Sequence, residues 1–73
     1  MTVPEYEDRI GRVSVCAMRI GGEPLLDRVT ERMGVAMRHL ERIRTGQLEL
    51  VPAVVDDIER SVLYAEELIE TST

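Results

Sequence analysis

The chain lacks lysine, asparagine, phenylalanine and tryptophan, and it has one cysteine, one histidine and two tyrosines. A single cysteine excludes a disulfide within the chain. Structural zinc sites usually have four cysteine or histidine ligands, and Cys16 and His39 supply two. No apolar run approaches the roughly 20 residues that span a bilayer, and no basic segment precedes an apolar one at the start. We therefore expect a cytoplasmic protein with no membrane span, metal or cofactor.

The chain has 73 residues, which is the length of one domain, and we treat residues 1–73 as a single helical unit. A chain this short buries only about 60% of the surface that its unfolded form exposes. Its core supplies roughly 3–5 kcal/mol unless something else adds stability. With no disulfide or metal expected, self-association or docking on a larger partner is the remaining source.

Apolar residues recur at alternating steps of three and four in three segments, the spacing of one face of a helix. We therefore predict helices over residues 3–20, 24–45 and 52–70. The apolar faces are Val3, Tyr6, Ile10, Val13, Ala17 and Ile20, then Leu26, Val29, Met33, Ala36, Leu40 and Ile43, then Val51, Val55, Ile58, Val62, Ala65 and Ile69. The predicted fold is all-α, a small antiparallel three-helix bundle or a helical hairpin plus an N-terminal helix. We expect it to be oligomeric or partner-bound.

Local signals mark the ends of these helices. Thr2 and Glu5 have the spacing of a capping box, and Pro24 suits the first turn of a helix that follows a turn at Gly22. Gly46 suits the left-handed position that ends a helix. One ambiguity remains in the first segment, because Gly11 weakens a helix interior and residues 12–20 also alternate loosely, as a strand would.

The net charge of −5 belongs to the last third of the chain. Residues 47–73 carry seven acids and one basic residue, Arg60. At about 100° per residue, two charged stripes emerge, each with an apolar residue inside it. The acidic stripe of the third helix is Asp56, Glu59, Glu66, Glu67 and Glu70 around Leu63, and the basic stripe of the second helix is Arg28, Arg32, His39 and Arg42 around Val35.

These stripes have two interpretations. They are either solvated faces with ordinary surface ion pairs, which contribute about 0–1 kcal/mol each, or they are docking surfaces. The stripes lie on opposite-handed flanks, which do not face each other in an antiparallel hairpin. Between two molecules they can meet, and complementary charge then sets the orientation. The eleven stripe residues are our candidates for partner binding.

Other polar groups give no signature of catalysis. His39 has no serine or cysteine at a recognisable spacing, and Cys16 lies at the edge of an apolar face, as a small hydrophobic residue would. The carboxylates of Asp56, Asp57 and Glu59 diverge on a helix and lack a Glu-x-x-His motif. We expect no enzyme activity.

The methionines and the aromatic residues bear on binding. Met33 and Met37 lie on the apolar arc of their helix and are predicted core residues, whereas Val15 and Met18 lie off the arc of the first helix and are predicted to be exposed. Direct binding to nucleic acid is not expected, since a chain of net charge −5 with two aromatic residues offers no basic patch interleaved with aromatics.

The segment from Leu40 to Leu50 resembles the helical-hairpin turn of the small subunit of exodeoxyribonuclease VII. Both place a glycine, here Gly46, before two leucines spaced by two, and both continue into a helix. The resemblance covers at most a third of the chain. It departs at residues 51–52, where Val-Pro stands in place of the family's acidic residue, and no site residue carries over.

We therefore predict a non-enzymatic protein–protein interaction module that self-associates or docks on a larger protein. Two alternatives stay open. One is a small inhibitor, of the kind that phages carry, whose acidic third helix blocks a basic, nucleic-acid-binding site. The other, implied by the resemblance, is a helical accessory subunit of a nucleic-acid enzyme.

Overall fold

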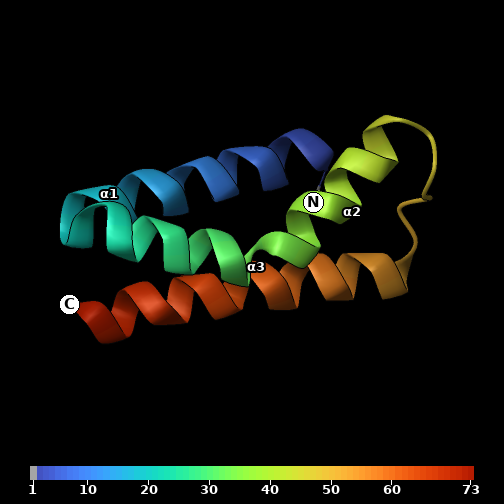
Figure 1. Ribbon diagram of the computed structural model, residues 1–73. Coiled ribbons are helices and arrows are strands. Elements are labelled where there is room, and N and C mark those ends of the chain that lie inside the picture. The colour runs from blue at the N-terminus through green and yellow to red at the C-terminus, as the bar shows by residue number, and fades with distance from the viewer. Residues whose placement is uncertain (1) are drawn as a thin grey trace.

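The computed structural model describes residues 2–73, which form three helices and no strand (Figure 1). They are α1 (Val3–Arg32), α2 (Gly34–Arg44) and α3 (Pro52–Ser72). The prediction of an all-α fold is confirmed for these residues. The chain runs along the bundle, reverses at Gly22 within α1, returns through the rest of α1 and α2, and reverses again into α3. All three helices contact one another.

The chain before Gly22 forms what we call the N-terminal arm, residues 3–21. Its start has the predicted capping box, because the Thr2 hydroxyl accepts a hydrogen bond from the Glu5 amide and the Glu5 carboxylate accepts one from the Thr2 amide. Residues 12–20 are helical, so the alternative of a strand is wrong. The weak alternation there carries no weight, since the 3.6-residue pattern extends over the whole arm.

The first reversal of the chain depends on two glycines. Gly22 has φ 68° and ψ −159°, a region of backbone conformation that is essentially restricted to glycine. A Cβ added at Gly21 would lie 2.6 Å from the Cβ of Leu25, so this position also needs glycine to let the returning chain approach. The predicted turn at Gly21-Gly22 is thus a sharp kink within α1, which is why α1 has Pro24 in its interior.

After the kink, residues 23–44 form what we call the middle arm. The sequence predicted one uninterrupted helix over 24–45, but the helix is interrupted at Met33, which separates α1 from α2. An uninterrupted helix would join the Ala36 amide to the Arg32 carbonyl. Instead, the Ser61 hydroxyl of α3 accepts from the Ala36 amide (3.3 Å) and donates to the Arg32 carbonyl (2.8 Å). Insertion of a side chain into the helical hydrogen-bond ladder is a recognised cause of such breaks.

The second reversal, residues 45–51, begins with a C-terminal cap on α2. Gly46 has φ 80°, the left-handed conformation that the sequence predicted. The Gln47 amide donates to the Arg42 carbonyl (2.8 Å) and the Gly46 amide donates to the Ile43 carbonyl (3.1 Å). This pair of bonds is the Schellman motif, which satisfies carbonyls that the helix end leaves free. The chain then enters α3 with Pro52 in the first turn.

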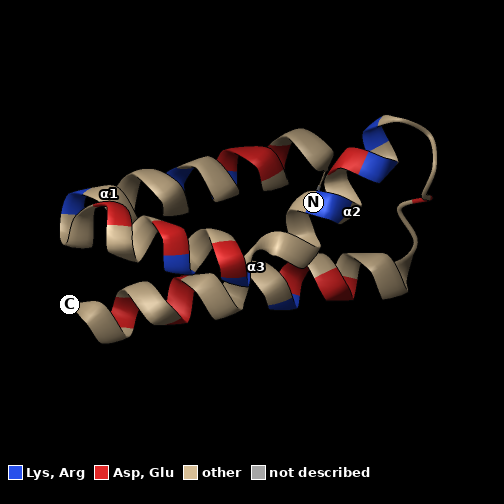
Figure 2. Cartoon of the chain, in the orientation of Figure 1, with Lys and Arg blue, Asp and Glu red and all other residues tan. Residues whose placement is uncertain are grey.

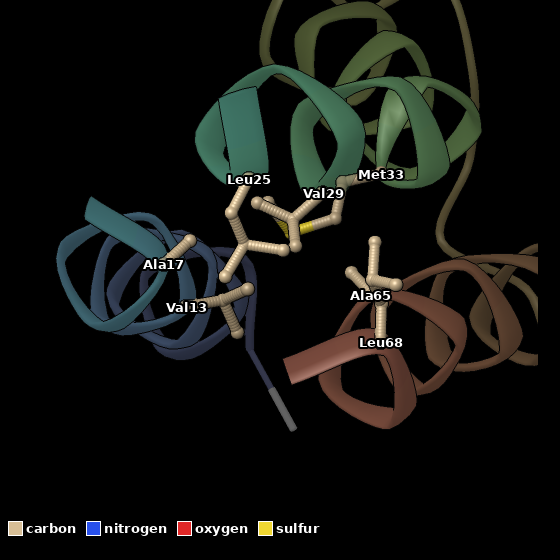
Figure 3. Packing of buried hydrophobic residues seen from close by; sticks show 7 residues of the cluster. All are labelled: Val13, Ala17, Leu25, Val29, Met33, Ala65 and Leu68. Carbon is tan, nitrogen blue, oxygen red and sulfur yellow. The ribbon is translucent and has the colours of Figure 1, made fainter. Parts of the chain in front are cut away.

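The core lies along the line where the three arms of the bundle meet, namely the N-terminal arm, the middle arm and α3. At the end that carries the Gly22 turn, side chains from all three arms point into one cluster (Figure 3), and these are Val13, Ala17, Leu25, Val29, Met33, Ala65 and Leu68. At the other end a second cluster consists of Tyr6, Ala36, Leu40, Ile58 and Val62. Most of these residues belong to the predicted apolar faces.

Several predicted core positions differ in the structure. Ile20 is exposed because the arm ends there and Leu25 fills the core at that level. Val51 is exposed because it precedes the first turn of α3. Met37 is 43% exposed, and it borders a depression shared with Gly11, which has no side chain to cover it.

Two pairs of adjacent residues share the core at the end near the Gly22 turn. Leu25 and Leu68 are buried, whereas the predicted Leu26 and Ile69 are half-buried beside them. Val15 and Met18 are exposed, as the sequence predicted. Within residues 2–73, none of the helices combines the length and the apolar character that crossing a bilayer requires.

Candidate functional site

One open groove lies on the surface where the middle arm packs against α3. Of the nine large hydrophobic side chains that are exposed among residues 2–73, three line it, namely Val35 (41% exposed), Leu63 (43%) and Tyr64 (53%). Charged residues of both signs surround them. The complete lining is Arg28, Glu31, Arg32, Val35, Asp57, Arg60, Ser61, Leu63, Tyr64 and Glu67.

Arg32 and Tyr64, which both line the groove, contact each other. The guanidinium carbon of Arg32 lies 3.8 Å from the centroid of the Tyr64 ring, within the range of a cation–π interaction. The same guanidinium donates a hydrogen bond to the Tyr64 carbonyl (3.0 Å). Ser61 forms the adjacent wall through its bonds to the middle arm. Arginine and aromatic side chains in the groove are therefore fixed before any partner binds.

The basic stripe predicted from the sequence lies along this side of the middle arm. Arg28, Arg32 and Val35 come together in the groove. Val35 also borders a second depression, which it shares with Arg38, His39, Glu41 and Arg42. The His39 ring nitrogen Nε2 lies 3.4 Å from the Asp57 carboxylate of α3. The apolar groove thus continues into a predominantly basic flank.

Part of the acidic stripe, Glu59 and Glu66, lies on the opposite flank of α3, beside the N-terminal arm. Arg9 donates to Glu59 (2.8 Å) and, through Nη2, to Glu66 (2.6 Å), so two of the predicted partner-binding carboxylates are bound within the chain. The hydrogen bonds to Glu66 and then to Glu59 raise the pKa of Arg9 above its ordinary value. Its side chain is 15% exposed and those of the glutamates are 38% and 35% exposed, which makes this a half-buried cluster.

The remaining acidic-stripe residues stay exposed. Leu63 and Glu67 lie at the crest of α3, because they line both the groove and a depression on the other side that includes Glu66 and Glu70. Asp56 is exposed near the start of α3. Figure 2 shows acidic residues on all three arms, and α3 carries six of them with one basic residue, Arg60.

Three residues that shape this surface were missed in the sequence. Tyr64 was noted only as one of two aromatics, yet it lies beside Leu63 in the chain and provides the largest apolar surface in the groove. Ser61 lies between the core residues Ile58 and Val62, and the sequence gives no signal of its hydrogen bonds to the middle arm. Arg9 has one signal in the sequence, which is its position next to the apolar Ile10. Its contact with Glu59 of α3 comes from the fold.

Among residues 2–73, no three histidine, cysteine or acidic side chains gather as a metal site would require. His39 is half-buried against Asp57, with no nucleophile within its hydrogen bonds. Cys16 is a half-buried free thiol.

Comparisons with family models, with characterised proteins and with solved structures find no match to the chain. The groove and its two flanks are therefore the features of the molecule from which we infer a function.

Proposed function

We propose that this protein is a non-enzymatic protein–protein interaction module and that the groove between the middle arm and α3 is its binding surface. The observation that carries the proposal is the grouping of Val35, Leu63 and Tyr64, all exposed, inside a charged rim. An apolar centre with a polar rim, enriched in tyrosine and arginine, is the usual anatomy of a protein interface.

The fixed Arg32–Tyr64 pair strengthens this proposal. Ordering long side chains at an interface costs about 0.5–1.5 kcal/mol for each one that becomes immobilised. Here the Arg32 guanidinium is already held by the ring and carbonyl of Tyr64. The groove therefore has a rigid anchor of the kind that dominates binding energy.

The single free cysteine fits a reducing, cytoplasmic compartment, which we also propose.

The two alternatives have less support. An acidic inhibitor needs free carboxylates along α3, but Glu59 and Glu66 are bound to Arg9. An accessory subunit of a nucleic-acid enzyme rests on the short resemblance at residues 40–50, and no family model or characterised protein matches the chain. For these reasons we place the interaction module first.

A pair of matched variants tests the groove. We expect Leu63→Glu to put a charge at the apolar centre and weaken binding to any physiological partner by tenfold or more. Val15→Glu is the control, since Val15 is 52% exposed and lies on the N-terminal arm away from the groove. Partners captured by the wild-type chain would be identified, purified and titrated against both variants by calorimetry. Equal affinities for the two variants would refute the proposed function.

A further inference from the structure

The groove lies between two flanks of opposite charge. Val35 connects it to the basic flank of the middle arm, and Leu63 connects it to the acidic flank of α3. The middle-arm side has four arginines against two glutamates, namely Arg28, Arg32, Arg38 and Arg42 against Glu31 and Glu41. The α3 side has four acids against three arginines, namely Asp57, Glu66, Glu67 and Glu70 against Arg9, Arg12 and Arg60.

A surface with this pattern is complementary to itself. We propose that the groove binds a second copy of this chain about a two-fold axis parallel to the helices. This inference rests on the proposed function and names its partner. In a two-fold dimer the same patch is used on both subunits. Rotation about an axis parallel to the helices places the basic flank of one copy over the acidic flank of the other.

The alternative axis is disfavoured by charge. Rotation about an axis that crosses the helices would place basic flank on basic flank and acidic on acidic, and like charges in contact cost stability. The parallel axis also preserves the level of each residue along the bundle. Arg32 contacts Tyr64 and the two elements run antiparallel, so Arg28, one turn before Arg32, lies at about the level of Glu67. In the dimer, Arg28 of one copy therefore comes close to Glu67 and Glu70 of the other.

The dimensions of the molecule favour a contact along its length. The bundle measures 35 × 18 × 17 Å, and stable interfaces bury about 800 Å² on each partner. An end of the bundle, 18 × 17 Å, is small against that requirement. A long face, 35 × 18 Å, is about twice as large as an end and comes nearer to that area, and it places the exposed side chains of Val35, Leu63 and Tyr64 near its centre.

Charge reversal on each flank tests this arrangement. One variant carries Arg28→Glu and Arg42→Glu, and the other carries Glu67→Arg and Asp56→Arg, whose positions lie at about the levels of Arg28 and Arg42 in the antiparallel pair. Each changes the net charge by four from −5, so both remain negative and have no general attraction for each other. Mass would be measured by sedimentation equilibrium, with circular dichroism to show that each variant is helical. We expect a wild-type dimer, two monomeric variants, and a dimer when the variants are mixed in equal amounts.

The control reverses two charges outside the groove, Asp8→Arg with Arg19→Glu, which border a depression on the N-terminal arm. We expect this variant to remain a dimer. A wild-type monomer at millimolar concentration, dimers from either single-flank variant alone, or no dimer in the mixture would each overturn the proposal. A monomeric wild type whose captured partner is still lost in Leu63→Glu would overturn the dimer alone and leave the proposed function intact.

Discussion

Glycine has different effects at different positions in this chain. Gly11 lies in the helical interior of the N-terminal arm, and an added Cβ would meet nothing within 4 Å. Glycine costs a helix about 0.5–1 kcal/mol relative to alanine. We therefore expect Gly11→Ala to raise the free energy of unfolding by about that amount, measured by urea denaturation.

Gly21 provides the contrast to Gly11. Its substitution by alanine should destabilise the fold, because the new Cβ would lie 2.6 Å from the Cβ of Leu25. Stabilisation by both substitutions would contradict this account of the turn. The sequence placed Gly11 in a helix interior and Gly21 in a turn, but the cost of a side chain at Gly21 depends on Leu25, which only the folded turn brings close.

Tyr6 makes stability depend on pH in the alkaline range. Its side chain is 1% exposed, and burial, followed by the negative charge of Glu59, raises the pKa of its phenol above the ordinary value. Folding therefore disfavours the phenolate. The buried phenol's contribution to the free energy of unfolding is complete below about pH 10, the pKa of a tyrosine in the unfolded chain. This contribution is lost as the pH rises through the pKa that the phenol has in the folded protein. We expect the free energy of unfolding to fall above about pH 10.

Two phenylalanine variants check the source of this decline. Tyr6→Phe should flatten the decline in chemical denaturation between pH 8 and pH 11. Tyr64→Phe, at a 53% exposed position, should keep it. If the wild type and Tyr6→Phe declined in parallel, the explanation through Tyr6 would be wrong.

At the scale of the helix, the break at Met33 shows what periodicity can predict. The steps of three and four along Val29, Met33, Ala36 and Leu40 continue through the break, and all four residues are buried. The pattern therefore predicted the buried face of the middle arm but not the break. Its cause is the hydroxyl of Ser61, 25 residues away from Ala36, which no local spacing encodes.

We expect Ser61→Ala to lower the free energy of unfolding by about 1–3 kcal/mol, because it leaves the Ala36 amide and the Arg32 carbonyl without their partner in a buried position. Ser14→Ala is the matched control. The Ser14 hydroxyl bonds only the Ile10 carbonyl of its own helix, so the change should stay within about 0.5 kcal/mol. Thermal and urea denaturation would measure both. An unchanged Ser61→Ala variant would mean that the middle arm closes into one helix without cost.

At the scale of the whole molecule, the sequence predicted three helices and their charged stripes. It did not predict which charged side chains form ion pairs within the chain. Wheel positions placed Glu59 and Glu66 on one flank of α3. They did not reveal that this flank faces Arg9, since that depends on which side of α3 the N-terminal arm packs. The handedness of the bundle thus decides which carboxylates are bound within the chain and which remain for a partner.

The ion pairs of Arg9 with Glu59 and Glu66 join the N-terminal arm to α3, so their loss should weaken the bundle as a whole. Arg9→Met keeps an apolar stem at this position but removes the guanidinium, which leaves Glu59 and Glu66 half-buried without their cation. Breaking a buried pair costs 3–5 kcal/mol, and partial exposure reduces this to about 1–3 kcal/mol. Adding Glu59→Gln and Glu66→Gln to Arg9→Met removes the uncompensated charges and should recover most of the loss. Urea denaturation of the single and triple variants measures both steps, and a triple variant no more stable than Arg9→Met would show that packing of the arginine stem, not its charge, joins the arms.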